Sequence, residues 1–422
     1  RWFTEGLAEY ETLAERSEWS RELDPDLFEA LRQNRVPEVQ AMSRAFTRAE
    51  QMSDVATAYY ASSKILTMMV QEYGMPKMRG MLEGWGDGKR TPAIFDGVLG
   101  MTPSAFDAEF RQHTRKSLGR YEKQFVPNLR AEPIDKVEEA RKQAPGDPDV
   151  LLRLARATWD AGDGDQTAAL LEKVLRTRPD VPDVRYLAAQ VALGQQRADA
   201  ALGHARRLVE LGHDGYWTQV ILGEVYAAQK RTAEAKRAFE AAHAFDTTQA
   251  EPLVALSRIA RTTGDVDAEI AALSKLGKLE QHGAGLFARL FELLTGKGRT
   301  QDIVALGETA LWADLSNFDV HYLLAMALEK TGQPKRALFE LESAVLCEAP
   351  PPQKAAAHAA LMRAYQRAGQ GAKAREQAAR LRELEQAGPR SATPPGTMPP
   401  GTISPGTMPP GAPPGGTTGD EE

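Results

Sequence analysis

The spacing of apolar residues predicts helices along almost the whole chain. Between residues 133 and 386, apolar positions recur three and four residues apart, which is the period of one face of an α-helix. Strand-like alternation of apolar and polar residues is absent from this stretch of the sequence. Residues 1–121 show the same helical period, with breaks at Pro25, Pro37 and Gly74. The pattern therefore predicts an all-α protein.

The helical pattern after residue 148 repeats every 34 residues. Units begin at 148, 182, 216, 250, 284 and 318, and a seventh begins near 355 after a short insertion. Each unit has a turn between two helices, marked by a glycine in most units, and a small residue where these helices are expected to approach closely. Phe291 is a bulky exception, so we expect its two helices to lie further apart. The small residues are Ala155, Ala189, Gly223, Ser257 and Ala325.

This arrangement resembles the tetratricopeptide repeat, a helix–turn–helix unit of 34 residues. The third unit carries the pattern best, with Gly223, Tyr226, Ala235, Phe239 and Ala242 at the characteristic places. The resemblance implies a solenoid over residues 133–386, whose first helices line a concave groove for a protein or an extended peptide. The alternative is that the groove residues only pack against their neighbours. The positions expected to face the groove are Leu152, Arg156, Trp159, Tyr186, Gln190, Val220, Glu224, Val254, Arg258, Glu292, Tyr322 and Met326.

Residues 2–10 read Trp-Phe-Thr-Glu-Gly-Leu-Ala-Glu-Tyr. This string resembles the Trp-x-x-Glu-Gly-x-Ala-x-Tyr string of gluzincin (peptidase MA-like) zinc metallopeptidases, and we place the C-terminal part of such a domain at residues 1–125. The resemblance implies that Glu5 is a zinc ligand and that Glu9 hydrogen-bonds a second ligand. It also implies that Tyr60 is a catalytic residue that stabilises the oxyanion, with Tyr59 as the competing choice. The alternative is that both carboxylates are ordinary solvated side chains and that Tyr60 is an ordinary buried tyrosine.

The sequence departs from the peptidase family in one respect. It contains no His-Glu-x-x-His, the motif that supplies the other two zinc ligands and the general base, and all seven histidines follow Glu5. We therefore expect neither strong zinc binding nor hydrolysis from this chain. Two hypotheses stand: a fragment of a zinc metallopeptidase joined to an interaction scaffold, or a non-catalytic scaffold or adaptor with a degenerate front domain. Because the chain begins with Arg1, we expect a processed or partial chain and favour an extracytoplasmic location.

Composition narrows the range of partners. The 422 residues include 52 basic and 58 acidic side chains, a net charge of -6, so we expect no nucleic-acid partner. The single cysteine, Cys347, excludes an intramolecular disulfide. No apolar run is long enough to span a membrane as a helix. Pentapeptides of the type Pro-Pro-Gly-Thr-Met recur near the end, which predicts a disordered tail over residues 387–422.

Overall fold

A computed structural model describes residues 1–15, 23–49, 52–279 and 285–386. All regular structure in these ranges is helical and no strand occurs in them, which confirms the predicted all-α class. None of these helices is long and apolar enough to cross a membrane. The proposed tail, 387–422, lies outside the described residues.

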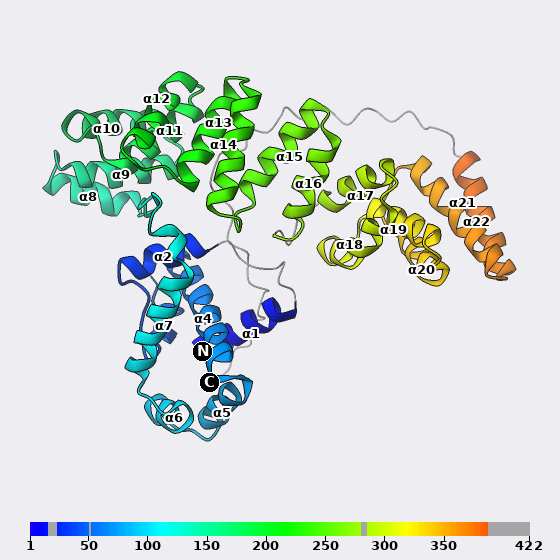
Figure 1. The fold of residues 1–422 in the computed structure, drawn as a ribbon, viewed down its shortest axis with the longest axis horizontal. Helices are drawn as coiled ribbons and strands as arrows, with labels where there is room; N and C mark the ends of the chain where they lie inside the picture. Colours follow the sequence, from blue (N-terminus) through cyan, green and yellow to red (C-terminus); the bar gives the residue numbers. More distant parts are fainter. Residues whose placement is uncertain (16–22, 50–51, 280–284, 387–422) are drawn as a thin grey trace. The chain divides into compact units, whose positions relative to one another are not determined.

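The described chain divides into two compact units. The first comprises residues 1–10 and 23–211, and the second comprises residues 11–15 and 212–386. The division falls between two helix pairs of the repeat array rather than between the front helices and the array (Figure 1). The domain boundaries expected from sequence, at residues 125 and 133, stay a prediction. Residues 125–132 contact both the front helices and the first two repeats, so all of these belong to one compact unit.

The front helices pack around α4 (Met52–Tyr73), which contributes wholly buried side chains such as Ile65 and Met69. Helices α2, α3, α5 and α7 all contact α4. Thr102 before a proline predicts a helix start, and α7 confirms it, because the Thr102 hydroxyl accepts a hydrogen bond from the N–H of Ala105 at 3.2 Å. The other elements are α1 (Trp2–Glu15), α2 (Asp24–Arg32), α3 (Met42–Ala45), α5 (Met75–Gly86), α6 (Thr91–Ile94), the π-helix η2 (Phe95–Leu99), α7 (Pro103–Ser117) and the 3₁₀-helix η3 (Gly119–Tyr121).

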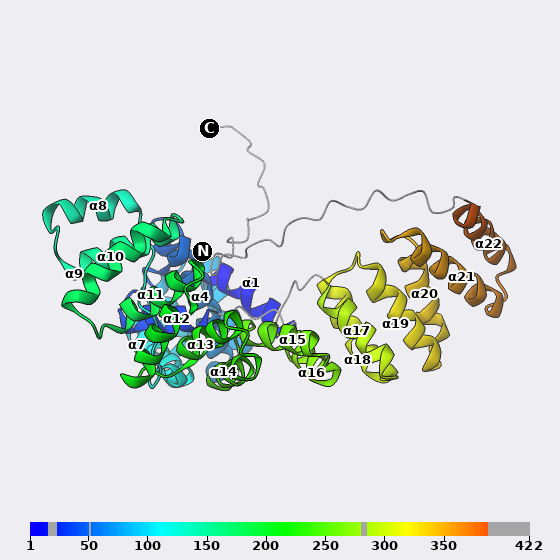
Figure 2. The ribbon, with the colours of Figure 1, turned by 90° about the horizontal axis from the view of Figure 1, so that it is seen from above.

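Within the described ranges, seven helix pairs follow helix α8 (Ile134–Gln143), and the 34-residue repeat predicts these pairs. Among the described residues, two of these pairs belong to the first compact unit and five to the second. Figure 2 labels the helices of all these pairs. The pairs are α9 (Pro148–Asp160) with α10 (Gly164–Thr177), α11 (Pro182–Gly194) with α12 (Ala198–Glu210), α13 (Tyr216–Ala228) with α14 (Thr232–Phe245), α15 (Glu251–Thr263) with α16 (Val266–Leu276), α17 (Leu286–Gly296) with α18 (Thr300–Ala313), α19 (Phe318–Lys330) with α20 (Pro334–Ala344), and α21 (Pro351–Arg367) with α22 (Gly371–Gln386).

Local chemistry ends one helix and begins the next within a pair. Gly162 follows α9 with a φ of 83°, a left-handed conformation that glycine adopts without steric cost. Asp163 then caps α10, since its carboxylate accepts a hydrogen bond from the N–H of Gln166 at 2.9 Å. The same Gly-Asp sequence recurs at Gly264 and Asp265, between α15 and α16. These short turns make each pair an antiparallel hairpin.

Small residues let the two helices of a repeat approach closely. A Cβ atom on Gly223 would lie 2.7 Å from the Phe239 ring, which confirms the predicted close approach of α13 and α14. In the fifth repeat, Phe291 and Gly307 stand at the places of Gly223 and Phe239, two repeats further along. The large and the small side chain have thus exchanged helices, and Phe291 is wholly buried.

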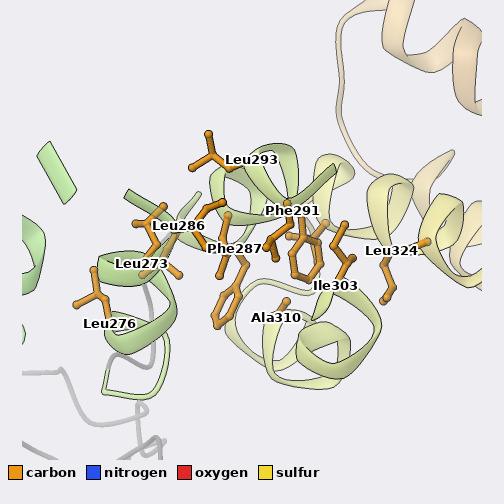
Figure 3. Packing of buried hydrophobic residues seen from close by; sticks show 14 of the residues in the cluster. Leu273, Leu276, Leu286, Phe287, Phe291, Leu293, Ile303, Ala310 and Leu324 are labelled. Carbon is orange, nitrogen blue, oxygen red and sulfur yellow. The ribbon is translucent and has the colours of Figure 1, made fainter. Parts of the chain in front are cut away.

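The core of the second unit is continuous between successive pairs. Figure 3 shows Phe287 and Phe291 of α17 beside Ile303 and Ala310 of α18, with Leu324 of α19 completing the cluster. The rings of Phe287 and Phe291 meet edge to face with centroids 6.4 Å apart. Each pair therefore buries its apolar surface against the next pair, as repeat proteins do.

Candidate functional site

Helix α1 is held by aromatic packing and by one close backbone approach. Trp2 and Phe3 are buried, and the ring centroids of Phe3 and Trp85 lie 4.8 Å apart. On the same side of α1, a Cβ atom on Gly6 would lie 2.8 Å from the carbonyl oxygen of Ser62 in α4. The glycine of the peptidase-like string therefore has a structural role in this fold, because no larger residue fits there.

The two carboxylates predicted to serve a zinc site, Glu5 and Glu9, lie half-buried on α1. Oε1 of Glu5 is 3.7 Å from Nε of Arg1, an ion pair across one helical turn. Within the described ranges, no group of three or more His, Cys, Asp or Glu side chains is placed to hold a metal ion. One carboxylate does not make a zinc site, so the metal roles of Glu5 and Glu9 stay predictions.

Tyr60, the predicted catalytic tyrosine, is buried and donates a hydrogen bond to Oδ1 of Asp24 at 2.6 Å. Arg120 donates to Oδ2 of the same carboxylate at 2.5 Å. Burial works to raise the pKa of Asp24, but nearby cations and these hydrogen bonds outweigh it and lower the pKa. Burial and the Asp24 charge raise the pKa of Tyr60. This geometry ties α2, α4 and η3 together, while the competing Tyr59 packs its ring on Phe46.

The repeats present a row of side chains from their first helices. We call the second, fifth and ninth residues of each repeat the first-helix face, because the first helices line the concave surface of such a solenoid. In the first unit it comprises Asp149, Leu152 and Arg156 on α9, and Asp183, Tyr186 and Gln190 on α11. In the second unit it includes Trp217, Val220 and Glu224 on α13, Glu251, Val254 and Arg258 on α15, and Asp319, Tyr322 and Met326 on α19.

An extended segment of the chain itself lies against this face in the first unit. Residues 125–132, which we call the strap, form neither helix nor strand. The Phe125 ring meets the Tyr186 ring at a centroid distance of 5.8 Å. The backbone N–H of Asn128 donates to Oδ1 of Asp183 at 2.7 Å. The predicted partner residue Tyr186 therefore contacts the protein's own chain.

The second half of the strap binds the first repeat. Glu132 accepts two hydrogen bonds from the Arg153 guanidinium of α9, both at 2.6 Å, and these bonds hold the pKa of Glu132 below its ordinary value. Leu129 packs against the apolar core formed by α8 to α11. On its other side, the strap contacts the front helices, since Arg130 donates to Oδ2 of Asp54 at 2.6 Å. The strap thus joins the front helices to the first two repeats.

The other predicted partner residues differ in how much packing occupies them. Trp159 packs on the end of α11, where a Cβ atom on Gly194 would lie 3.0 Å from its ring. Tyr322 is half-buried and stacks on Phe318 at a centroid distance of 5.5 Å. Arg258 is exposed. Contacts within the protein cover part of the surface of Trp159 and Tyr322, whereas Arg258 is open to solvent. The roles of these three residues in binding a partner stay predictions.

Two carboxylates give the first-helix face of the second unit a local acidic character. Burial and the neighbouring Glu251 raise the pKa of Glu224 to about 7, against the opposing effect of Arg258. Glu251 accepts a hydrogen bond from the Tyr216 hydroxyl at 3.2 Å, and the loss of water around its carboxylate raises its pKa although the residue as a whole is exposed. Near neutral pH, the protonated and the charged forms of Glu224 are therefore both populated. A cation placed beside this carboxylate would favour the charged form.

The strap and the Glu251 carboxylate are not among the site residues that the sequence predicts. The strap lies between the front helices and α8, and Pro127 and Pro133 mark it as a segment that does not continue either helix. That signal could have located an extended segment, but not the residues that it contacts. Glu251 stands one place after the start of its repeat, in register with Asp183, so the repeat phase could have identified it.

A tetratricopeptide-repeat family model matches residues 158–219, which include the end of α9, all of α10, α11 and α12, and the start of α13. This part of the chain is therefore similar to tetratricopeptide repeats. The helix pairs on either side of this range continue the same phase in sequence and in structure. The comparison with curated proteins gives no match. The comparisons lend no support to the gluzincin resemblance of residues 1–125.

Several solved tetratricopeptide-repeat proteins resemble part of the chain. A thermophilic one from Thermus thermophilus is 22% identical and covers 43% of this chain and 100% of its own, with a TM-score of 0.31. MamA from Desulfovibrio magneticus is 18% identical over 41% of this chain and 97% of its own, with a TM-score of 0.32. YrrB, described as having an unusual peptide-binding site, is 12% identical and covers 50% of this chain and 90% of its own, with a TM-score of 0.31. Because these TM-scores are low, the fold assignment rests on the repeats of this chain and not on the solved structures.

Proposed function

We propose that this protein is a tetratricopeptide-repeat scaffold that binds a protein or an extended peptide on its first-helix face. The strap is the observation that carries the proposal. An extended stretch of polypeptide lies on this face through a ring contact and a backbone N–H, and an ion pair ties its end to Arg153 beside the face on α9. These contacts need no regular structure in the bound segment, so a segment of another chain can make them as well.

The second unit offers this face to a partner. Val254 is 43% exposed and Arg258 is exposed, and both lie on α15 beside the carboxylates of Glu224 and Glu251. An exposed apolar side chain flanked by charges of both signs suits a peptide that combines an apolar anchor with charged residues. A polar rim around an apolar anchor is how protein interfaces are commonly built.

A display library of random peptides selected on the full chain tests this proposal. We expect Val254→Asp and Arg258→Glu each to weaken the selected peptides at least tenfold, measured as Kd by fluorescence anisotropy. Phe339→Ala is the matched control, because Phe339 is 62% exposed but lies on α20, a second helix. Peptides that lose affinity only in Phe339→Ala, or in none of the three variants, would contradict binding on the first-helix face.

The zinc metallopeptidase hypothesis is a second, narrower proposal. It rests on the string at residues 2–10, and the half-buried position of Glu5 leaves one side of this carboxylate accessible. A longer natural chain that supplies His-Glu-x-x-His would complete the ligand set. Its zinc content, measured by mass spectrometry, should be stoichiometric, lost in Glu5→Ala and retained in Tyr60→Phe. Zinc that survives Glu5→Ala unchanged would rule out the ligand assignment.

A further inference from the structure

We infer that the first-helix face of the first two repeats, together with Arg153 beside it on α9, is a peptide-binding surface that the strap occupies in cis. Its ligand in trans is an extended segment with an aromatic residue, an apolar residue four positions later and an acidic residue three positions beyond that. This pattern is the one that Phe125, Leu129 and Glu132 form in the strap. The inference rests on the proposed function, and it names the ligand chemistry of one part of the face.

The strap spans both repeats in a fixed direction. Its aromatic end meets Tyr186 on α11, and its acidic end meets Arg153 on α9, so the strap runs from the second repeat toward the first. Between them, Leu129 reaches the shared core of the two repeats. Three chemically different contacts, ordered along one extended segment, define a direction and a register for any peptide that replaces it.

The strap has the properties of a displaceable ligand. It belongs to no helix or sheet, and the N–H of Asn128, which donates to the face, is a group that any residue except proline can supply. Phe125 is 8% exposed and the Arg153–Glu132 pair is bidentate. Removal of the strap therefore uncovers the Tyr186 ring and leaves the partly exposed Arg153 guanidinium without its carboxylate.

Covalent connection explains why a peptide from another chain would bind weakly while the strap is in place. A short tether gives an effective concentration of about 1 mM, so a surface with a Kd of about 10 μM is occupied in cis about 99% of the time. The apparent affinity for a peptide in trans then falls by about a hundredfold. Release of the strap should restore the affinity for a peptide in trans.

The test uses the full chain and a fluorescein-labelled synthetic peptide of residues 123–134. We expect the unaltered protein to bind it at least tenfold more weakly than a released variant, Phe125→Ala with Glu132→Ala. Adding Arg153→Glu to the released variant should abolish binding, and a peptide carrying Glu132→Arg should then bind again. Far-UV circular dichroism and melting of each variant show that the repeats remain folded. Equal weak binding by folded released and unaltered proteins overturns the inference.

A second measurement needs no altered protein. Trypsin cleaves after Arg130 within the strap, and 1 mM unlabelled peptide, made with Lys123→Gln and Arg130→Gln so that trypsin does not cleave it, should accelerate this cleavage several-fold by displacing the strap. A peptide of the same composition in scrambled order is the control. Cleavage that ignores both peptides contradicts displacement. The inference can fail while library peptides that depend on Val254 and Arg258 still bind, so the two proposals are tested separately.

Discussion

At the scale of single residues, Gly6 determines how α1 meets α4. Its missing Cβ would lie 2.8 Å from a backbone oxygen, which cannot move aside as a flexible side chain can. We expect Gly6→Ala to lower the free energy of unfolding by about 2 kcal/mol through overpacking. Chemical denaturation of the full chain, followed by tryptophan fluorescence, measures it.

Gly203→Ala is the matched control. Gly203 lies inside α12 with open space at its Cβ position, so alanine should stabilise that helix by about 0.5–1 kcal/mol. If both glycine variants change stability in the same direction, the close approach of α1 and α4 does not govern the effect.

Glu224 should make stability fall as pH rises. Its pKa in the folded protein is raised from 4.5 to about 7, so the folded state holds a proton that the unfolded state releases between these values. We expect Glu224→Gln to be more stable than the parent by about 1–2 kcal/mol at pH 8 and to gain nothing at pH 4. Melting temperatures across this pH range test the prediction, with exposed Glu348→Gln as the control.

At the scale of elements, the pairing of α17 with its neighbours depends on a single large side chain. Phe291 is wholly buried among residues of α17, α18 and α19. We expect Phe291→Ala to lower the free energy of unfolding by about 3–5 kcal/mol, because it removes buried apolar surface and leaves a cavity. Phe339→Ala, at a position 62% exposed, should stay within about 0.5 kcal/mol of the parent. Comparable losses in both variants would contradict the packing in Figure 3.

The helix pairs are predictable from sequence because their determinants are local and periodic. The 34-residue phase alone places Gly223 at a close approach, and Thr102 followed by a proline alone marks a helix start. The strap is not predictable in the same way. Phe125 and Tyr186 are far apart in the sequence, and no periodic signal links them.

The candidate site is predictable only in part, for a similar reason. The repeat phase identifies Arg258 and Glu224 as first-helix residues, but it does not reveal that burial beside Glu251 raises the pKa of Glu224. Likewise, the sequence places Tyr60 on a helix without indicating that its hydroxyl donates to Asp24. Partners of this kind depend on tertiary packing, which a resemblance of short strings does not supply.

At the scale of the whole chain, two compact units predict unfolding in more than one step. Repeat arrays are stabilised mainly by contacts between neighbours, so cooperativity can break between units. We expect calorimetry to resolve two transitions. Gly6→Ala should shift only the transition of the first unit, and Phe291→Ala only that of the second. One transition that responds equally to both substitutions would show that the described chain unfolds as a single unit.

Recombination between repeats of this protein must respect what Gly307 faces. A Cβ atom on Gly307 would lie 2.7 Å from the Leu324 side chain of α19, so glycine at this place makes room for a leucine of the next repeat. A hybrid that takes its second helix from the third repeat would place Phe239 there, in space that Leu324 fills. A crossover at the boundary between the fifth and sixth repeats separates Gly307 from Leu324. The inheritable unit therefore extends across that boundary.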